Sequence, residues 1–376
     1  MNKLLLCAAL AAMGLAGAAQ AHDRDRHAVD LEGDDDSRAV TIAVFGDWPY
    51  NQNLLTNAPL LINSINADPE VSLVMHVGDI HSGSAPCTSA DIVPPIATSN
   101  PGWNQKIFYQ FQQFKAPLVY TPGDNEWTDC HRSKSKSSGA PLNELNSLRS
   151  LFFARPGHTL GMTDKRVLSQ AEKFDPAYPA DAKYVENMMW REGKIVFATV
   201  NMPGSNNDTV PWTGSFANPA AQALEVAERT AAAMRWLEAA FTGAKRHHAK
   251  AVVIATQADM WDLTALPTAV PPGDGLDQYT VFVKKLADLA LKFGKPVLLI
   301  NGDSHIYGSD KPLADPRSAT GVVHKVPAVP NLTRITVQGS TVAPAEWLRL
   351  TIDPETRDVF SWSNVPYCND PTGSCQ

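Results

Sequence analysis

Hydrophobic positions along the chain fall into short continuous runs that alternate with segments of helical periodicity. Apolar runs of about four to eight residues, rich in β-branched side chains, indicate buried strands, whereas apolar positions three or four residues apart indicate amphipathic helices. The predicted strands cover residues 40–45, 72–77, 117–121, 184–190, 194–200, 251–256 and 296–301. The predicted helices cover residues 53–67, 108–114, 142–153, 220–244 and 279–293.

This alternation of strands and helices predicts an α/β fold. Strands that are continuously apolar are typical of sheets covered on both faces. Residues 184–190 and 194–200 are separated by Glu192-Gly193, which indicates a hairpin, and residues 332–362 alternate like antiparallel strands. We therefore predict a layered α/β sandwich with a mixed sheet, built as one domain over residues 39–365.

The two ends of the chain differ in composition from this domain. Lys3, an apolar run over 4–19 and Ala19-Gln20-Ala21 predict a secretory signal over residues 1–21, because the run is shorter than the roughly 20 residues of a membrane span. Residues 22–38 are acidic and poor in large apolar side chains, which predicts a disordered leader. Residues 366–376 form a C-terminal tail. No membrane insertion is expected, and the predicted location is periplasmic or secreted.

Composition and cysteine count agree with an exported globular protein. The chain has 376 residues, 44% of them hydrophobic, and a net charge of −7, which gives no electrostatic reason to expect nucleic acid as a partner. Removal of the signal leaves four of the five cysteines, an even number in a compartment that permits disulfides. We favour Cys87–Cys130, in loops after neighbouring strands, and Cys368–Cys375 in the tail. A cysteine metal site is less favoured because no C-x-x-C pair exists.

Acidic residues recur where the predicted strands end. In an α/β sheet the carboxyl ends of the strands line one crevice, and four carboxylates gathered there repel each other unless cations neutralise them. The pattern therefore predicts a metal site, although Gly-Asp is also an ordinary turn dipeptide. The pairs are Gly46-Asp47, Gly78-Asp79, Gly123-Asp124 and Gly302-Asp303, and His305 follows the last.

The order and spacing of these motifs over residues 40–310 resemble those of the calcineurin-like metallophosphoesterases, which include the purple acid phosphatases. That family carries D-x-H, G-D, G-N-H-[D/E], a lone histidine after a strand, and G-H-x-H. The resemblance implies a layered α/β/β/α sandwich with mixed sheets and a dinuclear metal site. It assigns one ion to Asp47, Asp79 and His305, and the other to Asp79, Asp124, Gln257 and Asp303.

The ligand set departs from the family pattern at several positions. Pro49 stands where D-x-H has its histidine, and Gln257 and Asp303 replace two histidine ligands. Tyr50 could compensate, although its position matches no family motif. Because oxygen donors dominate, we expect two divalent ions, Mn or Mg in the first place, with Ca, Fe or Zn as alternatives.

The function implied is hydrolysis of a small phosphorylated substrate, a phosphate mono- or diester, by metal-activated water. The candidate catalytic residues are His81 and His131, as general acids in loops at the crevice, and Asn125, which stands where the family has a histidine that assists the reaction. The alternative is a degenerate member of the fold that binds a metal or ligand without turnover. The sequence predicts no oligomeric state.

Overall fold

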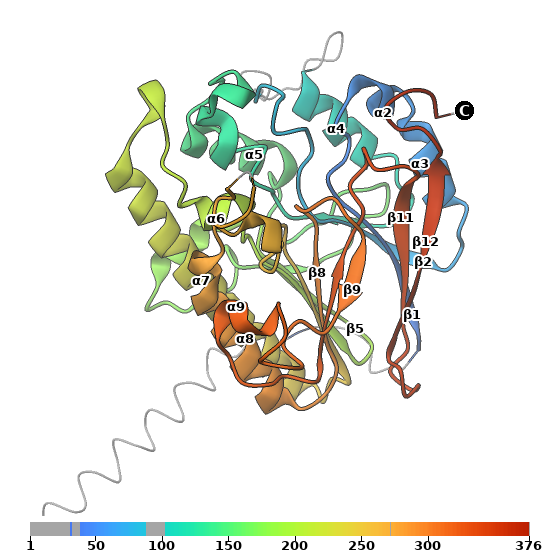
Figure 1. The fold of residues 1–376 in the computed structure, drawn as a ribbon. Helices are drawn as coiled ribbons and strands as arrows, with labels where there is room; N and C mark the ends of the chain where they lie inside the picture. The colour runs from blue at the N-terminus through green and yellow to red at the C-terminus, as the bar shows by residue number, and fades with distance from the viewer. Residues whose placement is uncertain (1–30, 32–37, 88–101, 271, 376) are drawn as a thin grey trace, which may run out of the picture.

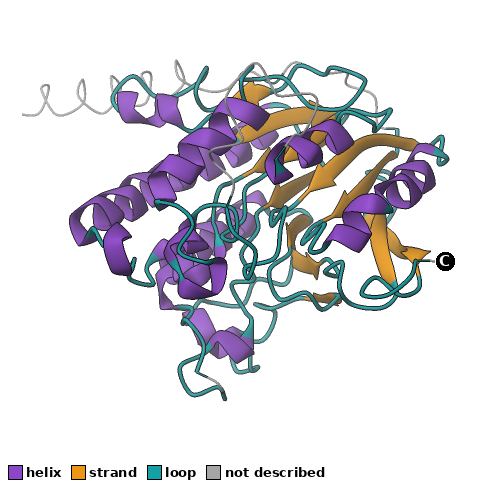
Figure 2. Ribbon diagram, turned by 90° about the horizontal axis from the view of Figure 1, so that it is seen from above, coloured by secondary structure: helices purple, strands orange, loops and turns teal. Residues whose placement is uncertain are grey.

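Two mixed β-sheets pack face to face, with helices on the outer side of each (Figures 1 and 2). This computed structural model describes residue 31 and residues 38–87, 102–270 and 272–375. The first sheet has the order β12 (Phe360–Cys368), β11 (Ala345–Ile352), β1 (Val40–Phe45), β2 (Val71–His76) and β3 (Leu118–Tyr120). The second has the order β4 (Leu168–Ser169), β5 (Met188–Glu192), β6 (Ile195–Thr199), β7 (Ala251–Ala255), β8 (Val297–Asn301), β10 (Leu332–Thr336) and β9 (Gly308–Asp310).

The helices complete the outer layers. Side chains of α3, α4 and α5 pack with those of the first sheet, and side chains of α7 and α8 pack on the second. The α-helices are α2 (Gln52–Thr56), α3 (Ala58–Asn66), α4 (Trp103–Phe111), α5 (Pro141–Phe152), α6 (Gly204–Asp208), α7 (Pro219–Arg246), α8 (Thr280–Phe293) and α9 (Gly321–His324). The 3₁₀ turns are η2 (Thr128–His131), η3 (Ser133–Ser135), η4 (Pro179–Lys183), η5 (Gly214–Phe216), η6 (Leu263–Ala265) and η7 (Asp277–Tyr279). The predicted α/β/β/α sandwich is thus confirmed.

Strand direction determines where the loops meet. In the first sheet, β1, β2 and β3 are parallel to one another, and β11 is antiparallel to both of its neighbours, β1 and β12. In the second sheet, β6, β7, β8 and β10 are parallel to one another, β5 is antiparallel to both β6 and β4, and β9 is antiparallel to β10. Loops after parallel strands leave from one end of the sheet, so the chemistry-bearing loops of each sheet are gathered together.

The core shows why the strands are continuously apolar. Along β7, Val253 belongs to the cluster between the sheets, whereas Val252 and Ile254 belong to the cluster under α7 and α8. Successive side chains of a strand point to opposite faces, so a strand buried on both faces needs apolar residues at every position.

Several boundaries differ from those predicted. The helix predicted over 53–67 is two helices, because α2 ends at Thr56 and α3 begins at Ala58 with Pro59 in its first turn. Within 332–362, β10 pairs in parallel with β8, so the antiparallel pair is β11 and β12.

The ends of the chain are described in part. Residues 1–21 and most of the leader over 22–38 lie outside the described residues. Leu31 of the leader is buried, its N–H donates to His247 Nε2 (3.3 Å), and its carbonyl accepts from Arg191 Nε (3.3 Å). Leu31 thus contacts the folded domain from within the segment predicted to be a disordered leader. No helix in the described part of the chain is long and apolar enough to cross a membrane.

Candidate metal centre

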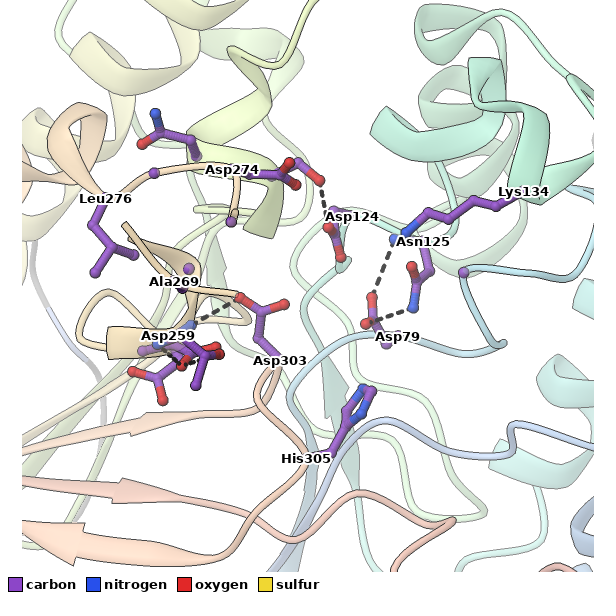
Figure 3. Close-up of a pocket in the computed structure, with 18 of the residues that line it drawn as sticks. Asp79, Asp124, Asn125, Lys134, Asp259, Ala269, Asp274, Leu276, Asp303 and His305 are labelled. Atoms are coloured by element: carbon purple, nitrogen blue, oxygen red, sulfur yellow. Dashed lines mark hydrogen bonds between the residues drawn. The ribbon is translucent and has the colours of Figure 1, made fainter. Parts of the chain in front are cut away.

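The four aspartates predicted from the strand ends converge on one place, and Figure 3 shows three of them, Asp79, Asp124 and Asp303, together with His305. Two groups could each hold a metal ion: Asp47, Asp79 and His305 form one, and Asp79, Asp124 and Asp303 form the other. Within each group the potential ligand atoms lie within 4.8 Å of one another, and Asp79 belongs to both. The structure therefore brings together five of the six predicted ligands in the predicted grouping.

The backbone at four of these five residues adopts a left-handed conformation. The φ angles are 49° at Asp47, 62° at Asp79, 76° at Asp303 and 66° at His305. For non-glycine residues this conformation costs about 1 kcal/mol or more each, and such strain clusters at functional sites. At three of the four Gly-Asp pairs the aspartate itself adopts this conformation, and Gly78 adopts it as well (φ 95°).

Two of the neighbouring glycines are needed for close approach. A Cβ on Gly123 would lie 2.0 Å from Asp79 Oδ1, and a Cβ on Gly302 would lie 2.6 Å from Asp47 Oδ2. Any side chain at either position would displace a carboxylate. The Gly-Asp pairs therefore pack one strand end against the carboxylate of another.

Tyr50 reaches the first group of ligands. Its hydroxyl donates to Asp47 Oδ1 and Asp79 Oδ2 at 2.9 Å each, sharing its single proton, and it lies 3.0 Å from His305 Nε2. Asn125 Nδ2 donates to the Tyr50 hydroxyl (3.1 Å) and to Asp79 Oδ2 (2.8 Å). The phenol oxygen thus lies among the three side chains of one metal group.

Gln257, which was predicted as a ligand of the second ion, lies beside the second group but does not present a ligand atom to it. Its Nε2 donates to a carboxylate oxygen of Asp124 and to one of Asp303 (3.1 Å each), and its Oε1 accepts from the Gly204 N–H (2.5 Å). An amide nitrogen has no lone pair to offer a cation. In this geometry Gln257 bridges two carboxylates, which differs from its predicted role as a ligand.

Burial and the charges of neighbouring groups shift the pKa values of the titratable side chains at the site. Burial, followed by the charges of Asp124 and other nearby carboxylates, raises the pKa of Asp79 well above its ordinary value. Burial and Asp129 raise the pKa of Asp124 to about 6. Burial lowers the pKa of His305, but the hydrogen bond and charge of Asp47 outweigh it, so the pKa is raised overall. A bound cation would favour the charged form of each carboxyl.

The candidate general acids do not lie where they were expected. His81 is buried, and its Nδ1 lies 3.0 Å from the Ser82 carbonyl oxygen. His131 is buried, and its Nδ1 accepts from the Thr213 N–H (3.0 Å). Neither lines the cleft formed by the described residues. His81 therefore bonds to the adjacent residue and His131 to a residue 82 positions away, and the sequence does not show on which side of a loop a side chain lies.

The cleft above the carboxylates has a volume of about 940 Å³. Its floor is formed by Tyr50, Asp79, Asp124, Asn125, Asp303 and His305. Arg132 and Lys134 also line the cleft, as do several residues within 262–270 and 272–276. The cleft is large enough for a small organic phosphate together with ions on its floor.

The structure adds two residues that the sequence analysis did not select. Glu126 is buried, and its Oε1 accepts from the N–H groups of Asp79 (3.2 Å) and Gly123 (2.7 Å), which ties two loops together. Ser205 Oγ donates to carboxylate oxygens of Asp124 and Asp129 at 2.7 Å each, sharing one proton. No sequence motif identifies these partners of Ser205, which lie 76 and 81 residues away along the chain.

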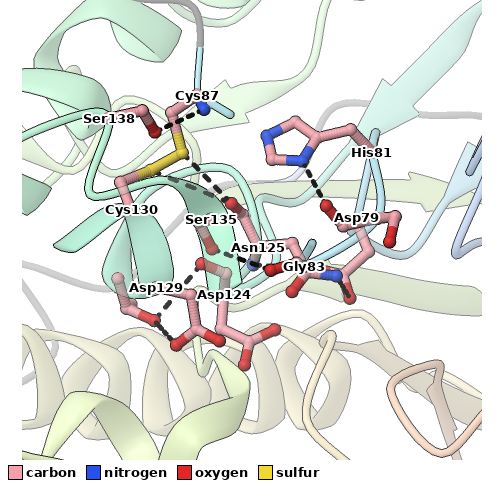
Figure 4. Close-up of a disulfide and its surroundings, with 12 residues drawn as sticks. Asp79, His81, Gly83, Cys87, Asp124, Asn125, Asp129, Cys130, Ser135 and Ser138 are labelled. Atoms are coloured by element: carbon pink, nitrogen blue, oxygen red, sulfur yellow. Dashed lines mark hydrogen bonds between the residues drawn. A yellow bond between two sulfur atoms is a disulfide. The ribbon is translucent and has the colours of Figure 1, made fainter. Parts of the chain in front are cut away.

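Both predicted disulfides are present, and one lies directly behind the site (Figure 4). The Sγ atoms of Cys87 and Cys130 lie 3.4 and 3.8 Å from the backbone oxygen of Asn125. This bond joins the loop after β2 to the loop after β3. The pair Cys368–Cys375 joins the last strand to the tail.

The residues present fit divalent cations. Each group offers three donors at least partly buried, and carboxylate oxygens outnumber the single imidazole. Such a set suits hard ions that prefer oxygen ligands. Burial, followed by the charges of its neighbours, raises the pKa of Asp79, so the four carboxylates also need positive charge to remain ionised together.

Comparisons with known proteins do not assign the chain to a family. No family model matches the chain, and no curated protein matches it in sequence. Among solved structures, the chain is similar to GAP50, described as the anchor in the inner membrane complex of Plasmodium, at 9% identity with a TM-score of 0.41. The likeness covers 88% of this chain and 90% of that one, and it is too weak to bear on the fold or function of this chain.

Proposed function

We propose that the chain is an exported, metal-dependent phosphoesterase that acts on phosphate mono- or diesters. The observation that carries this proposal is the pair of ligand groups sharing Asp79 at the floor of an open cleft. Two cations held close together by a shared carboxylate are the arrangement used for in-line displacement at phosphorus. The two disulfides and the signal-like N-terminus support export.

The chain's own residues would hold and orient the reacting groups. Asp47 and His305 complete one ion's ligands, and Asp124 and Asp303 the other's. Divalent ions supply positive charge to the phosphoryl oxygens and lower the pKa of water. Asn125 Nδ2 and its backbone N–H fix both oxygens of Asp79, at 2.8 and 3.2 Å, so the shared carboxylate keeps one orientation.

Hydrolysis forms one bond from phosphorus to a water oxygen and breaks the bond from phosphorus to the leaving oxygen, which takes up a proton. His81 and His131 do not line the cleft among the described residues, and the imidazole that does, His305, belongs to a ligand group. We therefore assign the proton of the leaving group to solvent in the open cleft. Mn or Mg are the ions we propose first, because oxygen donors dominate.

A second candidate function is cation binding without turnover. It is favoured by the two amides at the site: Asn125 occupies a position where an imidazole would assist the reaction, and Gln257 presents nitrogen to Asp124 and Asp303. A protein of this kind would keep the two ion sites but would not hydrolyse phosphate esters.

The test is a hydrolysis and binding screen of the metal-stripped chain from residue 22 onward. p-Nitrophenyl phosphate and its bis-ester are offered with Mn²⁺, Mg²⁺, Ca²⁺, Fe²⁺ or Zn²⁺, and cation binding is followed by calorimetry. Asp79→Asn removes the shared charge, and Asp288→Asn, an exposed residue of α8 paired with Lys292, is the control. Thermal melting establishes that each variant is folded.

We expect turnover that depends on the cation, falls at least a thousandfold in Asp79→Asn and stays unchanged in Asp288→Asn. Cation affinity should fall about a hundredfold in Asp79→Asn, because both groups lose a charge. Cation binding by the wild type with no turnover above Asp79→Asn would reject the enzyme in favour of the second candidate. Absence of cation binding would reject both.

A further inference from the structure

A lysine stands over the acidic floor of the cleft. Lys134 lines the cleft, its side chain is 49% exposed, and in Figure 3 it extends toward Asn125. Among the described residues, Asp129 is the carboxylate within ion-pair distance of its Nζ (3.1 Å). Asp129 also pairs with Arg132 Nη1 (2.9 Å), so the two cations share it. An ammonium carries three N–H donors, and one carboxylate oxygen does not use them all.

The segment that carries Lys134 is held in place on both sides. Ser135 Oγ donates to the Gly83 carbonyl (2.7 Å), and the Cys87 N–H donates to Ser138 Oγ (2.7 Å). The disulfide from Cys87 to Cys130 fixes the same two loops covalently. The fixed segment and the ion pair with Asp129 together restrict the positions of the Lys134 ammonium before any ligand arrives, which reduces the entropy lost on binding.

Gly83 leaves the space between Lys134 and Asn125 open. A Cβ at this position would lie 2.3 Å from Asn125 Oδ1 and 3.2 Å from Lys134 Nζ. Both polar groups therefore border the same small volume. Because Asn125 Nδ2 donates to Asp79 Oδ2, this volume adjoins the carboxylate shared by the two ligand groups.

We infer that Lys134 binds the terminal phosphoryl oxygens of a dianionic phosphate monoester seated over Asp79, and that it makes the cleft selective for monoesters. This inference rests on the proposed function, since it names the substrate class of that site. A monoester has a second pKa near 6 and carries close to two negative charges at neutral pH, whereas a diester carries one. A fixed ammonium beside the phosphoryl group therefore favours the monoester.

The first test uses inorganic phosphate as the probe, so it does not depend on turnover. Phosphate binding is measured by calorimetry on the mature chain loaded with the cation that the screen above selects. We expect binding about tenfold weaker in Lys134→Gln, which loses one charge-assisted hydrogen bond, and within threefold of wild type in Lys134→Arg. Lys136→Gln, an exposed lysine two residues away that does not line the cleft, is the matched control.

The second test compares the two esters. In Lys134→Gln we expect KM for p-nitrophenyl phosphate to rise about tenfold and KM for the bis-ester to change less than threefold, with cation affinity unchanged. Unaltered phosphate binding in Lys134→Gln would overturn the inference, and so would an equal loss with both esters. Phosphate binding that depends on Lys134 in a protein without turnover would reject the proposed function and leave the binding role of Lys134 standing.

Discussion

Tyr50 contributes to the site from a position that belongs to no recognised motif. Its hydroxyl contacts Asp47, Asp79 and His305 at 2.9 to 3.0 Å, and its ring meets the His305 ring edge to face, with centroids 5.1 Å apart. Burial and the two aspartates raise the pKa of the phenol well above its ordinary value. The hydroxyl therefore donates its proton and holds the three ligands toward one point.

Replacing Tyr50 by Phe should weaken cation binding. The variant keeps the ring and removes the oxygen that orients three ligands, and loss of such an orienting contact typically costs tenfold to a hundredfold in metal affinity. We expect about a tenfold increase in Kd by calorimetry, with Tyr109→Phe on α4 unchanged. Equal or tighter binding in Tyr50→Phe would show that the phenol competes with the cation.

His76 should make stability depend on pH below neutrality. Its Nδ1 accepts from the Gly78 N–H (3.2 Å) and its Nε2 donates to the Trp48 carbonyl (3.0 Å), an arrangement that the neutral tautomer satisfies. Burial lowers the pKa of His76 to about 4, whereas an unfolded histidine titrates near 6.5. Between these values the unfolded chain binds more protons. Stability is therefore fully present above about pH 6.5 and is lost as pH falls toward 4, by roughly 3 kcal/mol.

Thermal melting across pH 4.5–7.5 tests this titration. His76→Gln cannot titrate, so its melting temperature should fall less steeply on acidification than that of the wild type. The exposed His248→Gln should follow the wild type. The acids of the site titrate in all three proteins, so the difference in slope isolates His76. Parallel slopes for wild type and His76→Gln would contradict the assignment.

The part of the site that sequence predicts is the part fixed by local position. Asp47, Asp79 and Asp303 follow buried strands directly, so their convergence needs only the sheet direction. The orientation of Gln257 depends on the Gly204 N–H, 53 residues away in sequence, and no local pattern reveals that partner. The position of Lys134 likewise depends on a 3₁₀ turn held by distant contacts.

At the level of elements, α6 is the most unusual segment. Ser205, Asn206, Asn207 and Asp208 have φ between 51° and 62°, so this turn is left-handed over four consecutive non-glycine residues. Asn and Asp tolerate this conformation better than most residues, which accounts for the composition of the turn. Arg229 of α7 holds it in place by donating to the Asn207 carbonyl (3.1 Å).

Because Ser205 lies in a left-handed turn, glycine at this position should be more stabilising than alanine, which is the opposite of their order in a right-handed helix. Both Ser205→Ala and Ser205→Gly lose the hydrogen bonds to Asp124 and Asp129, but glycine relieves the backbone strain. Ser205→Gly should be more stable than Ser205→Ala by about 1 kcal/mol in urea unfolding. At Ser147, inside the right-handed helix α5, the order should reverse by a similar amount. The same order at both sites would contradict a left-handed Ser205.

Strands could be predicted from the sequence where burial on both faces requires a continuous run of apolar residues. The predicted strand over 40–45 coincides with β1, because each of its positions has to fit a sheet covered on both faces. β9, with the sequence Gly-Ser-Asp, is short and polar, and it exists because it pairs with β10 at the edge of the sheet. Its tertiary partner, and not its own sequence, makes it a strand.

For the molecule as a whole, the site exists because the two sheets face each other. Asp47, Asp79 and Asp124 come from the first sheet, whereas Asp303 and His305 come from the second. Each ligand group includes residues from both sheets, so neither sheet alone could hold an ion. Anything that loosens the loops after β2 and β3 should therefore reduce cation affinity as well as stability.

Removing each disulfide in turn distinguishes a loss of stability from a loss of cation affinity. Cys87 and Cys130 are 43 residues apart, and closing a loop of that length stabilises the fold by about 4 kcal/mol in the chain-entropy model. Cys368 and Cys375 are 7 residues apart, which corresponds to about 2 kcal/mol. Paired Cys→Ser variants of either bond should lose stability in that order in urea unfolding. Cation affinity should fall only for the first pair, because its sulfur atoms lie behind Asn125, which orients Asp79. Equal cation affinity in both variants would show that the site is held by the packed sheets alone.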